Sequence, residues 1–309
     1  MAKGPRRILP DRIYEVSIRT FQSQLLLTPS PRLNELINGV IGLALERYDV
    51  QLYWYVFMSN HYHMALSSRR PQHLVRFLNF VNGNIACEAN RLLGRRGSFW
   101  DGPYEPLELS DEPGLAERRL AYLLGQGCKE GLVASPREWP GVSPLNSLLR
   151  GEMPKGCWVD RTRMYHAANS KLGARAESHY EVTCEVPLTP LPEWSDLDEV
   201  QRRARIEDIV QAIEDQTADE NAECGQQPMG AVAVMATDPL TTPARSKRRP
   251  SPRFLWLSAE VGRRRWASYR AFLAEYRSAS EALRAGNLQV EFPPWSFRPA
   301  PPMVCGPPK

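Results

Sequence analysis

The chain has 309 residues, a formal net charge of +4 at pH 7 and an isoelectric point near 8.7. This length accommodates two ordinary domains, and the mild basic excess permits nucleic-acid binding without demonstrating it. Six cysteines occur without a Cys-x-x-Cys pair, which argues against a zinc ribbon or a disulfide framework. No apolar run approaches the ~20 residues of a membrane span, and no apolar segment follows the basic start. We therefore expect a soluble, cytoplasmic protein with no membrane partner.

The chain begins with a predicted strand and a predicted helix. Apolar and polar side chains alternate from Ile13 to Thr20, as in a half-buried strand. Ser30 and Pro31 then provide an N-cap and a first helical residue. Apolar residues recur at helical spacing from Leu33 to Tyr48, so this helix should pack on a sheet.

Residues 52–66 predict a β-hairpin that carries two histidines. Its first strand is rich in aromatic and β-branched residues, and Ser59-Asn60 provides the turn. Because side chains alternate along a strand, His61 and His63 should share one face while Tyr62 points to the core. Taken alone, a His-x-His pair is more often two hydrogen-bonded sheet residues than a pair of metal ligands.

A helix over residues 71–92, a basic loop and a short strand follow the hairpin. The loop contains Arg95 and Arg96, and the Phe99-Trp100 pair precedes a predicted strand from Tyr104 to Leu109. An aromatic residue beside a basic loop can stack on single-stranded bases, or it can fill the core under a turn. The residues leave both interpretations open.

A helix over residues 117–129 carries Tyr122 and, one turn later, Gln126 on the same side. The element order to this point is β-α-β-β-α-β-α. Such an order predicts an α+β fold, with a ferredoxin-like antiparallel sheet and helices on one face.

The histidine pair and the tyrosine helix together resemble the HUH single-tyrosine transposases, in particular the REP-associated tyrosine transposases. Three segments are similar to the family's motifs: Tyr55 to His63, Ser98 to Tyr104, and Lys129 to Val133 followed by Trp139-Pro140. The resemblance covers the first half of the chain. The family commonly has Arg at the position of Pro103 and Asn-Pro at the position of Gln126-Gly127. Gln126 retains an oxygen for a hard cation, whereas Pro103 removes one expected phosphate contact.

The resemblance implies a transposase or endonuclease that nicks and rejoins single-stranded DNA near hairpins through a 5′-phosphotyrosine intermediate, as a monomer or homodimer. Tyr122 would be the nucleophile. The ligands of a divalent cation, Mg²⁺ or Mn²⁺, would be His61, His63 and Gln126. The expected nucleic-acid contacts are Arg95, Arg96, Trp100 and Tyr104.

Residues 151–309 predict a mainly helical, partly disordered C-terminal extension beyond the HUH domain of residues 1–150. We expect a short helix over 158–165, a strand over 180–186 and a helix from Ser195-Asp196 to about 216. The polar, basic and Pro-rich composition of residues 217–252 predicts a loop or disordered linker. A last helix should run from Ser258 to Ala285 and end at Gly286. This extension is either an accessory DNA-gripping module or a packing extension.

Two alternative functions remain. A catalytically inactive nucleic-acid-binding protein derived from a transposase would bind DNA or RNA without cleaving it. Another HUH endonuclease, of the replication-initiator or relaxase type, would share the histidine pair. Such enzymes usually place the nucleophile differently around that pair, and the chain has no P-loop.

Overall fold

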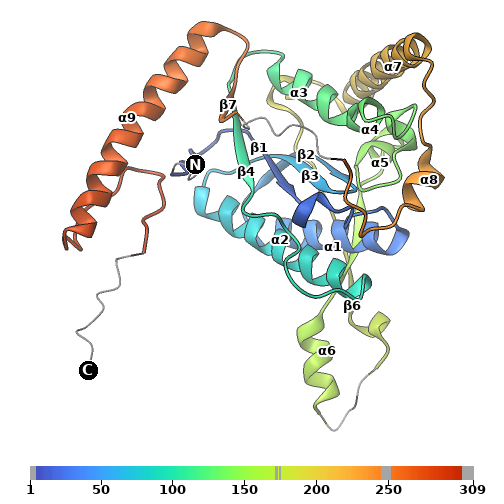
Figure 1. Cartoon of the computed structure of the whole chain (residues 1–309), viewed down its shortest axis with the longest axis horizontal. Helices are drawn as coiled ribbons and strands as arrows, with labels where there is room; N and C mark the ends of the chain where they lie inside the picture. The colour runs from blue at the N-terminus through green and yellow to red at the C-terminus, as the bar shows by residue number, and fades with distance from the viewer. Residues whose placement is uncertain (1–4, 171–172, 174, 245–251, 301–309) are drawn as a thin grey trace.

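The protein is a mixed α/β molecule built on a five-stranded sheet (Figure 1). The computed structural model describes residues 5–170, 173, 175–244 and 252–300. The strand order is β2-β3-β1-β4-β7. The strands are β1 (Tyr14–Arg19), β2 (Gln51–Met58), β3 (His61–Ser67), β4 (Glu105–Leu109) and β7 (Phe254–Leu255). The first four pair antiparallel, as predicted, but β7 pairs parallel with β4, so the sheet is mixed.

Helices α1 (Pro31–Arg47) and α2 (Pro71–Leu92) cover one face of the sheet and bury its main core. The predicted N-cap is confirmed, because the Ser30 hydroxyl accepts a hydrogen bond from the Leu33 N–H at 3.3 Å. The strand residues on this face alternate with residues on the other. They are Tyr14, Val16, Ile18, Tyr55, Phe57, Tyr62, Met64 and Leu66. The alternation of apolar and polar residues in the sequence therefore predicted this buried face correctly.

The expectation that helices lie on one face only is wrong. Helices α3 (Leu115–Leu124), α4 (Gln126–Lys129), α5 (Leu145–Leu149) and α7 (Glu199–Cys224) lie on the opposite side (Figure 1). Strand β2 presents Trp54, Val56 and Met58 to these helices, so both of its faces are apolar. A sheet that is apolar on both faces must be covered on both.

A second, two-stranded sheet packs against α1. It consists of β5 (Lys155–Val159) and β6 (Glu181–Glu185), and α6 (Arg161–Ala168) follows β5. A Cβ atom on Gly39 would lie 2.2 Å from the Cys157 carbonyl carbon, so only glycine permits this backbone approach.

The helix predicted over residues 158–165 is in part a strand. Residues 158–159 end β5, and α6 begins after Asp160, whose side chain caps that helix.

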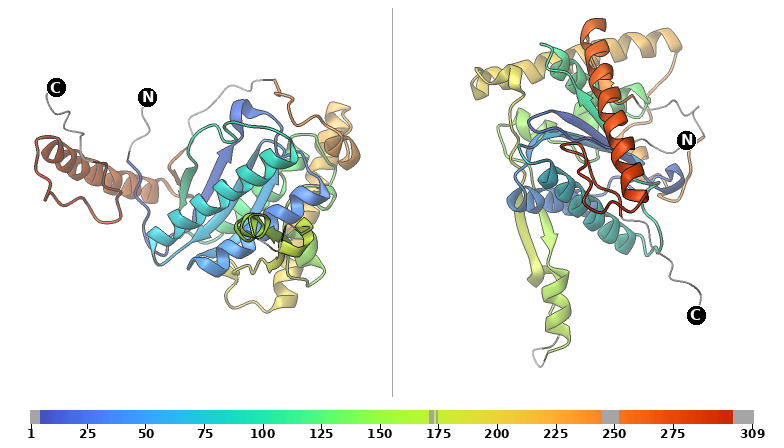
Figure 2. Two further views of the ribbon diagram at one scale, coloured as in Figure 1. Left: turned by 90° about the horizontal axis from the view of Figure 1, so that it is seen from below. Right: turned by 90° about the vertical axis from the view of Figure 1, so that its left-hand side faces the viewer.

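The C-terminal part is more helical than its composition suggested. An Asp198 capping box starts α7, which continues through residues 217–224, and α8 (Ala231–Met235) follows. Those stretches correct the linker predicted over 217–252, of which residues 245–251 lie outside the described part. Ser258 caps α9 (Ala259–Arg284), which extends away from the rest of the molecule (Figure 2). Short 3-10 turns cover Phe21–Ser23, Pro136–Glu138, Glu177–Tyr180 and Pro192–Trp194. Within the described residues, no helix is both long and apolar enough to cross a membrane.

Candidate active site

His61 and His63 lie side by side on the face of β3 that α3 and α4 cover. Their ring centroids are 5.1 Å apart and the rings are nearly perpendicular. Tyr62 points to the other face, where its ring lies 4.8 Å from that of Phe57. The predicted shared orientation of the two imidazoles is confirmed.

Each imidazole is oriented by an oxygen atom at its Nδ1. His63 Nδ1 lies 2.7 Å from Glu15 Oε1, and His61 Nδ1 lies 2.7 Å from Asn60 Oδ1. The Asn60 amide is itself oriented, because its Nδ2 donates to the Ser23 carbonyl at 3.3 Å. An acceptor at Nδ1 keeps the proton there and leaves the Nε2 lone pair available, which is the form that a metal or a proton donor needs.

Glu15 is a site residue that the sequence did not reveal. It lies on β1 with 3% of its surface exposed, and Arg119 donates to both of its carboxylate oxygens. Burial acts to raise the pKa of Glu15, but the hydrogen bonds from Arg119 and His63 outweigh it and lower that pKa to about 2. In the sequence, Glu15 is one of the polar residues of an alternating strand, a pattern that predicts a side chain facing solvent.

Tyr122 and Gln126 reach the site from two helices. The predicted continuous helix is broken, because α3 ends at Leu124 and α4 begins at Gln126. Tyr122 is 42% exposed, whereas Gln126 is 7% exposed and lies beside His61. The Arg119 guanidinium lies 3.9 Å from the centroid of the Tyr122 ring. Arg119 therefore connects the exposed phenol to Glu15 and, through it, to the histidines.

The charge state of the site suits metal binding. Burial lowers the pKa of His61 to about 3, and the nearby His63 and Arg19 act in the same direction. A neutral imidazole is the metal-ligating form. Among the described residues, no group of three or more His, Cys, Asp or Glu side chains is placed to hold a metal. A cation bound here would therefore depend on the Gln126 amide oxygen as a third ligand, a set that fits Mn²⁺ or Mg²⁺.

Trp100 and Tyr104, two of the residues expected to contact nucleic acid, pack against other residues of the protein. The ring of Trp100 lies edge-on to Tyr62 at 5.6 Å, and its indole N–H donates to the Asn82 carbonyl at 2.9 Å. Tyr104 is 5% exposed, and the Arg6 guanidinium lies 4.4 Å from its ring centroid. Of the two readings of this aromatic segment, the structure favours core packing.

The two loop arginines differ from each other. Arg95 donates to Asn90 Oδ1 at 2.8 Å and to the Ser98 carbonyl at 2.9 Å, which closes the loop after α2. Arg96 is exposed. Arg96 therefore stays a predicted phosphate contact, while Arg95 has a structural role in this loop.

Comparison with known proteins finds solved structures to which the chain is similar, two of which are the following. One is a REP-associated tyrosine transposase bound to a REP hairpin, with 15% sequence identity, a TM-score of 0.39, and coverage of 50% of this chain and 89% of that one. The other is named a “putative transposase” from Deinococcus radiodurans R1, with 15% identity, a TM-score of 0.23, and coverage of 41% and 98%. No family model and no curated protein matches the chain. Because both TM-scores lie below 0.5, the role of the site rests on its own geometry.

Proposed function

We propose that this protein cleaves and rejoins single-stranded DNA, with Tyr122 as the nucleophile. The observation that carries the proposal is the continuous connection from an exposed phenol through Arg119 and Glu15 to His63, beside His61 and Gln126. A buried network of this kind costs free energy, so its termination at an exposed nucleophile on the surface favours a chemical role.

The reaction exchanges one phosphodiester bond for another. The Tyr122 oxygen attacks a DNA phosphorus atom, the bond from phosphorus to the 3′ oxygen breaks, and the phenol proton is lost while the leaving oxygen becomes a 3′-hydroxyl. The product is a 5′-phosphotyrosine. Attack by another 3′-hydroxyl on that phosphorus releases the phenol and rejoins the strand, so no ATP is required.

Arg119 and Lys129 supply positive charge where the reaction needs it. The Lys129 ammonium lies 5.1 Å from the Tyr122 ring centroid, and the Arg119 guanidinium lies 3.9 Å from it. These cations attract the scissile phosphate and stabilise negative charge as the phenol loses its proton. Glu15 holds the Arg119 guanidinium by two oxygens, which limits its freedom to follow the phosphate away from the site.

His61, His63 and Gln126 would hold a divalent cation, Mn²⁺ or Mg²⁺. Such a cation, when bound, polarises the phosphate and neutralises its developing charge. In this chain Glu15 and Asn60 orient the two rings, and the low pKa of His61 keeps its imidazole neutral across the physiological range.

The finer features of the fold and substrate belong to the same proposal. The first four strands, in the order β2-β3-β1-β4 with α1 and α2 as crossovers, support a ferredoxin-like domain. We infer a single-stranded substrate adjoining a hairpin, because the tyrosine must reach one phosphate between splayed nucleotides.

The decisive test replaces Tyr122 by Phe, which removes one oxygen from a side chain that is largely at the surface. Wild-type protein, a hairpin oligonucleotide and Mn²⁺ should give a covalent protein–DNA adduct on a denaturing gel, and Tyr122→Phe should give none while binding DNA normally. As a second variant, His61→Ala with His63→Ala should lose both Mn²⁺ affinity and cleavage.

The position of the label identifies the bond that breaks. Label placed 3′ of the nick should travel with the protein, and label placed 5′ of it should be released. Cleavage at the wild-type rate by Tyr122→Phe, or an adduct that retains the 5′ label, contradicts the mechanism. DNA binding without any adduct from wild-type protein would instead favour the inactive nucleic-acid-binding alternative.

A further inference from the structure

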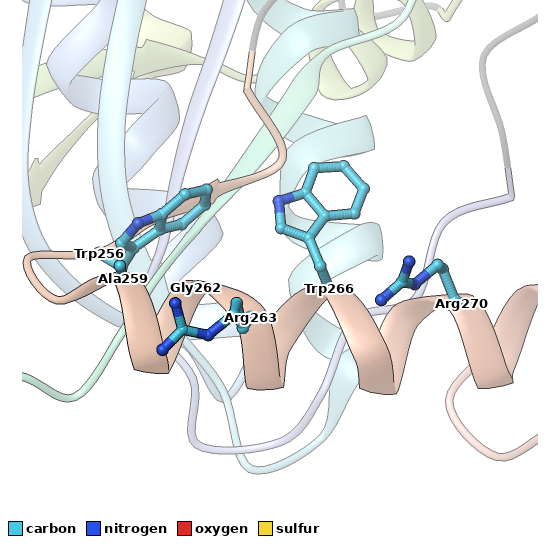
Figure 3. Close-up of a pocket in the computed structure, with 6 residues that line it drawn as sticks. All are labelled: Trp256, Ala259, Gly262, Arg263, Trp266 and Arg270. Atoms are coloured by element: carbon cyan, nitrogen blue, oxygen red, sulfur yellow. The ribbon is translucent and has the colours of Figure 1, made fainter.

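Two tryptophans and two arginines form an open cleft on α9, apart from the candidate active site. Trp256 precedes the helix and Trp266 projects from it, and together with Arg263 and Arg270 they line a cavity of about 310 Å³ (Figure 3). Trp266 is 39% exposed. Large aromatic rings at the surface are costly to leave in water, so a cleft built from two of them requires an explanation.

The protein holds both rings firmly on their inner sides. Trp266 packs against Phe254, with ring centroids 5.4 Å apart and planes nearly perpendicular. Trp256 lies against Gly262, where a Cβ atom would come within 2.5 Å of the indole. Glycine at this position therefore allows Trp256 to lie close to the helix, and the space between the two indoles stays open.

The arginines at the cleft differ from their neighbour on the same helix. Arg265 donates to Glu108 at 2.5 Å and to Asp111 at 3.3 Å, which anchors α9 to the sheet. Arg263 and Arg270 are exposed, and neither makes an ion pair with an acid in the part of the chain that the structure describes. They are seven positions apart, or about 10 Å along a helix, so their charges flank the cleft.

We propose that this cleft binds a nucleobase of single-stranded DNA between Trp256 and Trp266, with neighbouring phosphates on Arg263 and Arg270. Flat aromatic surfaces with free cations beside them are the features by which proteins bind single strands without reading sequence. The net charge of α9 supports an anionic partner, because the helix contains six arginines and three glutamates.

Hydrogen bonds attach the segment before α9 to the chain just before α3, the helix that carries Tyr122. Glu112 accepts hydrogen bonds from the backbone N–H groups of Leu257 and Ser258, each at 2.8 Å. Glu112 lies three residues before the first residue of α3. A DNA strand held between the tryptophans would therefore be anchored near the start of α3, the helix that presents the nucleophile. The inference rests on the proposed function.

The test measures binding of a fluorescein-labelled oligothymidine to full-length Tyr122→Phe protein, by anisotropy over a range of salt concentrations. Trp256→Ala should weaken binding about fivefold or more, the effect of losing one stacked base. An oligonucleotide of the same length with abasic sites should bind the parent protein about as weakly as oligothymidine binds Trp256→Ala.

Charge and folding controls use exposed residues. Arg263→Gln with Arg270→Gln should reduce the slope of log affinity against log salt by about 1.4, the value for two single-strand phosphates. Arg277→Gln with Arg284→Gln removes the same charge farther along α9 and should leave the slope unchanged. Because the four arginines are exposed, these variants stay informative even if Trp256→Ala fails to fold.

Three results would overturn the proposal. Equal binding of abasic and thymidine strands would exclude a base site, and equal losses from the two arginine pairs would indicate diffuse attraction only. A dimer that Trp256→Ala converts to a monomer would identify a second copy of the chain as the occupant. If wild-type protein forms the adduct but Trp256→Ala does not weaken binding, only this inference is wrong. If Trp256→Ala weakens binding but wild-type protein forms no adduct, only the proposed cleavage is wrong.

Discussion

Each face of the sheet buries one carboxylate beside an arginine, and the pKa values of the two carboxylates shift in opposite directions. Glu108 lies on the α1 and α2 face, opposite Tyr14, and burial raises its pKa despite the nearby Arg265. Glu15 lies on the α3 face, and hydrogen bonds from Arg119 and His63 lower its pKa to about 2 against the effect of burial. On the α3 face, hydrogen bonds from neighbouring side chains therefore keep the buried carboxylate charged.

The two carboxylate–arginine pairs have different roles: one attaches a helix to the sheet, and the other positions groups of the candidate active site. Arg265 divides its donors between Glu108 and the exposed Asp111, and the result is attachment of α9 to the sheet. Arg119 gives two donors to Glu15 and lies over Tyr122, so the charge of Glu15 positions groups that face solvent. Groups with strongly shifted pKa values cluster at functional sites, and the Glu15 pair leads to an exposed side chain, as such a site requires.

The largest effect should appear in the pH dependence of stability. The pKa of Glu15 falls from 4.5 to about 2 on folding. Its charge therefore stabilises the fold above pH 4.5, and this contribution of about 3 kcal/mol is lost as pH falls from about 4.5 to about 2. Urea unfolding at a series of pH values should show that Glu15→Gln lacks this acid-dependent loss.

Glu108→Gln provides the matched comparison. Because folding raises the pKa of Glu108, the folded state takes up a proton more readily than the unfolded state, and acid relieves the cost of burying that charge. The difference in stability between wild type and Glu108→Gln should thus change with pH in the opposite direction. Parallel curves for the two variants would remove the contrast between the faces.

Cleavage should separate the two carboxylates next. Glu15→Gln should lower the rate of adduct formation by about 10–100-fold, the usual cost of losing a group that orients a ligating histidine. Glu108→Gln should cleave at the wild-type rate when its folded fraction is matched. An equal loss in both variants would mean that Glu15 supports the fold rather than the chemistry.

The local parts of this site could be predicted from the sequence. The alternation along residues 61–66 placed His61 and His63 on one face, and spacing on a helix placed Tyr122 near Gln126. Each of these predictions depends on neighbours within a few residues. The hairpin, the Ser30 cap and the start of the last helix were predictable for the same reason.

The remaining parts depend on distant segments. Arg119 reaches Glu15 across 104 residues of sequence, and nothing near either residue announces the pairing. The second covered face was missed because Trp54, Val56 and Met58 read as part of one continuous apolar strand. Composition also failed for residues 217–224, a polar stretch that continues α7: Thr217 is buried there, so the helix packs against the body at this point, and its hydroxyl donates to the Ile213 carbonyl one turn earlier in the same helix.

A smaller effect should follow from changing the shape of the Arg119 side chain while keeping its charge. Arg119→Lys loses the fork that spans both oxygens of Glu15 and should slow cleavage about tenfold, the effect of one lost charged hydrogen bond. Arg118→Lys is the matched control, because Arg118 is the exposed neighbour on the same helix. Single-turnover adduct formation at saturating DNA measures both. If Arg118→Lys slows cleavage equally, general positive charge on α3 matters and the link to Glu15 does not.

The smallest effect is expected on the α1 and α2 face, away from the histidines and Tyr122. Gly83 lies on the exposed side of α2, and a Cβ atom there would meet nothing within 4 Å. Gly83→Ala should therefore raise the free energy of unfolding by about 0.5–1 kcal/mol, because alanine loses less backbone entropy than glycine in a helix. Urea denaturation measures the gain, and the cleavage rate should not change, since α2 and the histidines lie on opposite sides of the sheet. A change in cleavage without a change in stability would show that the two faces are coupled.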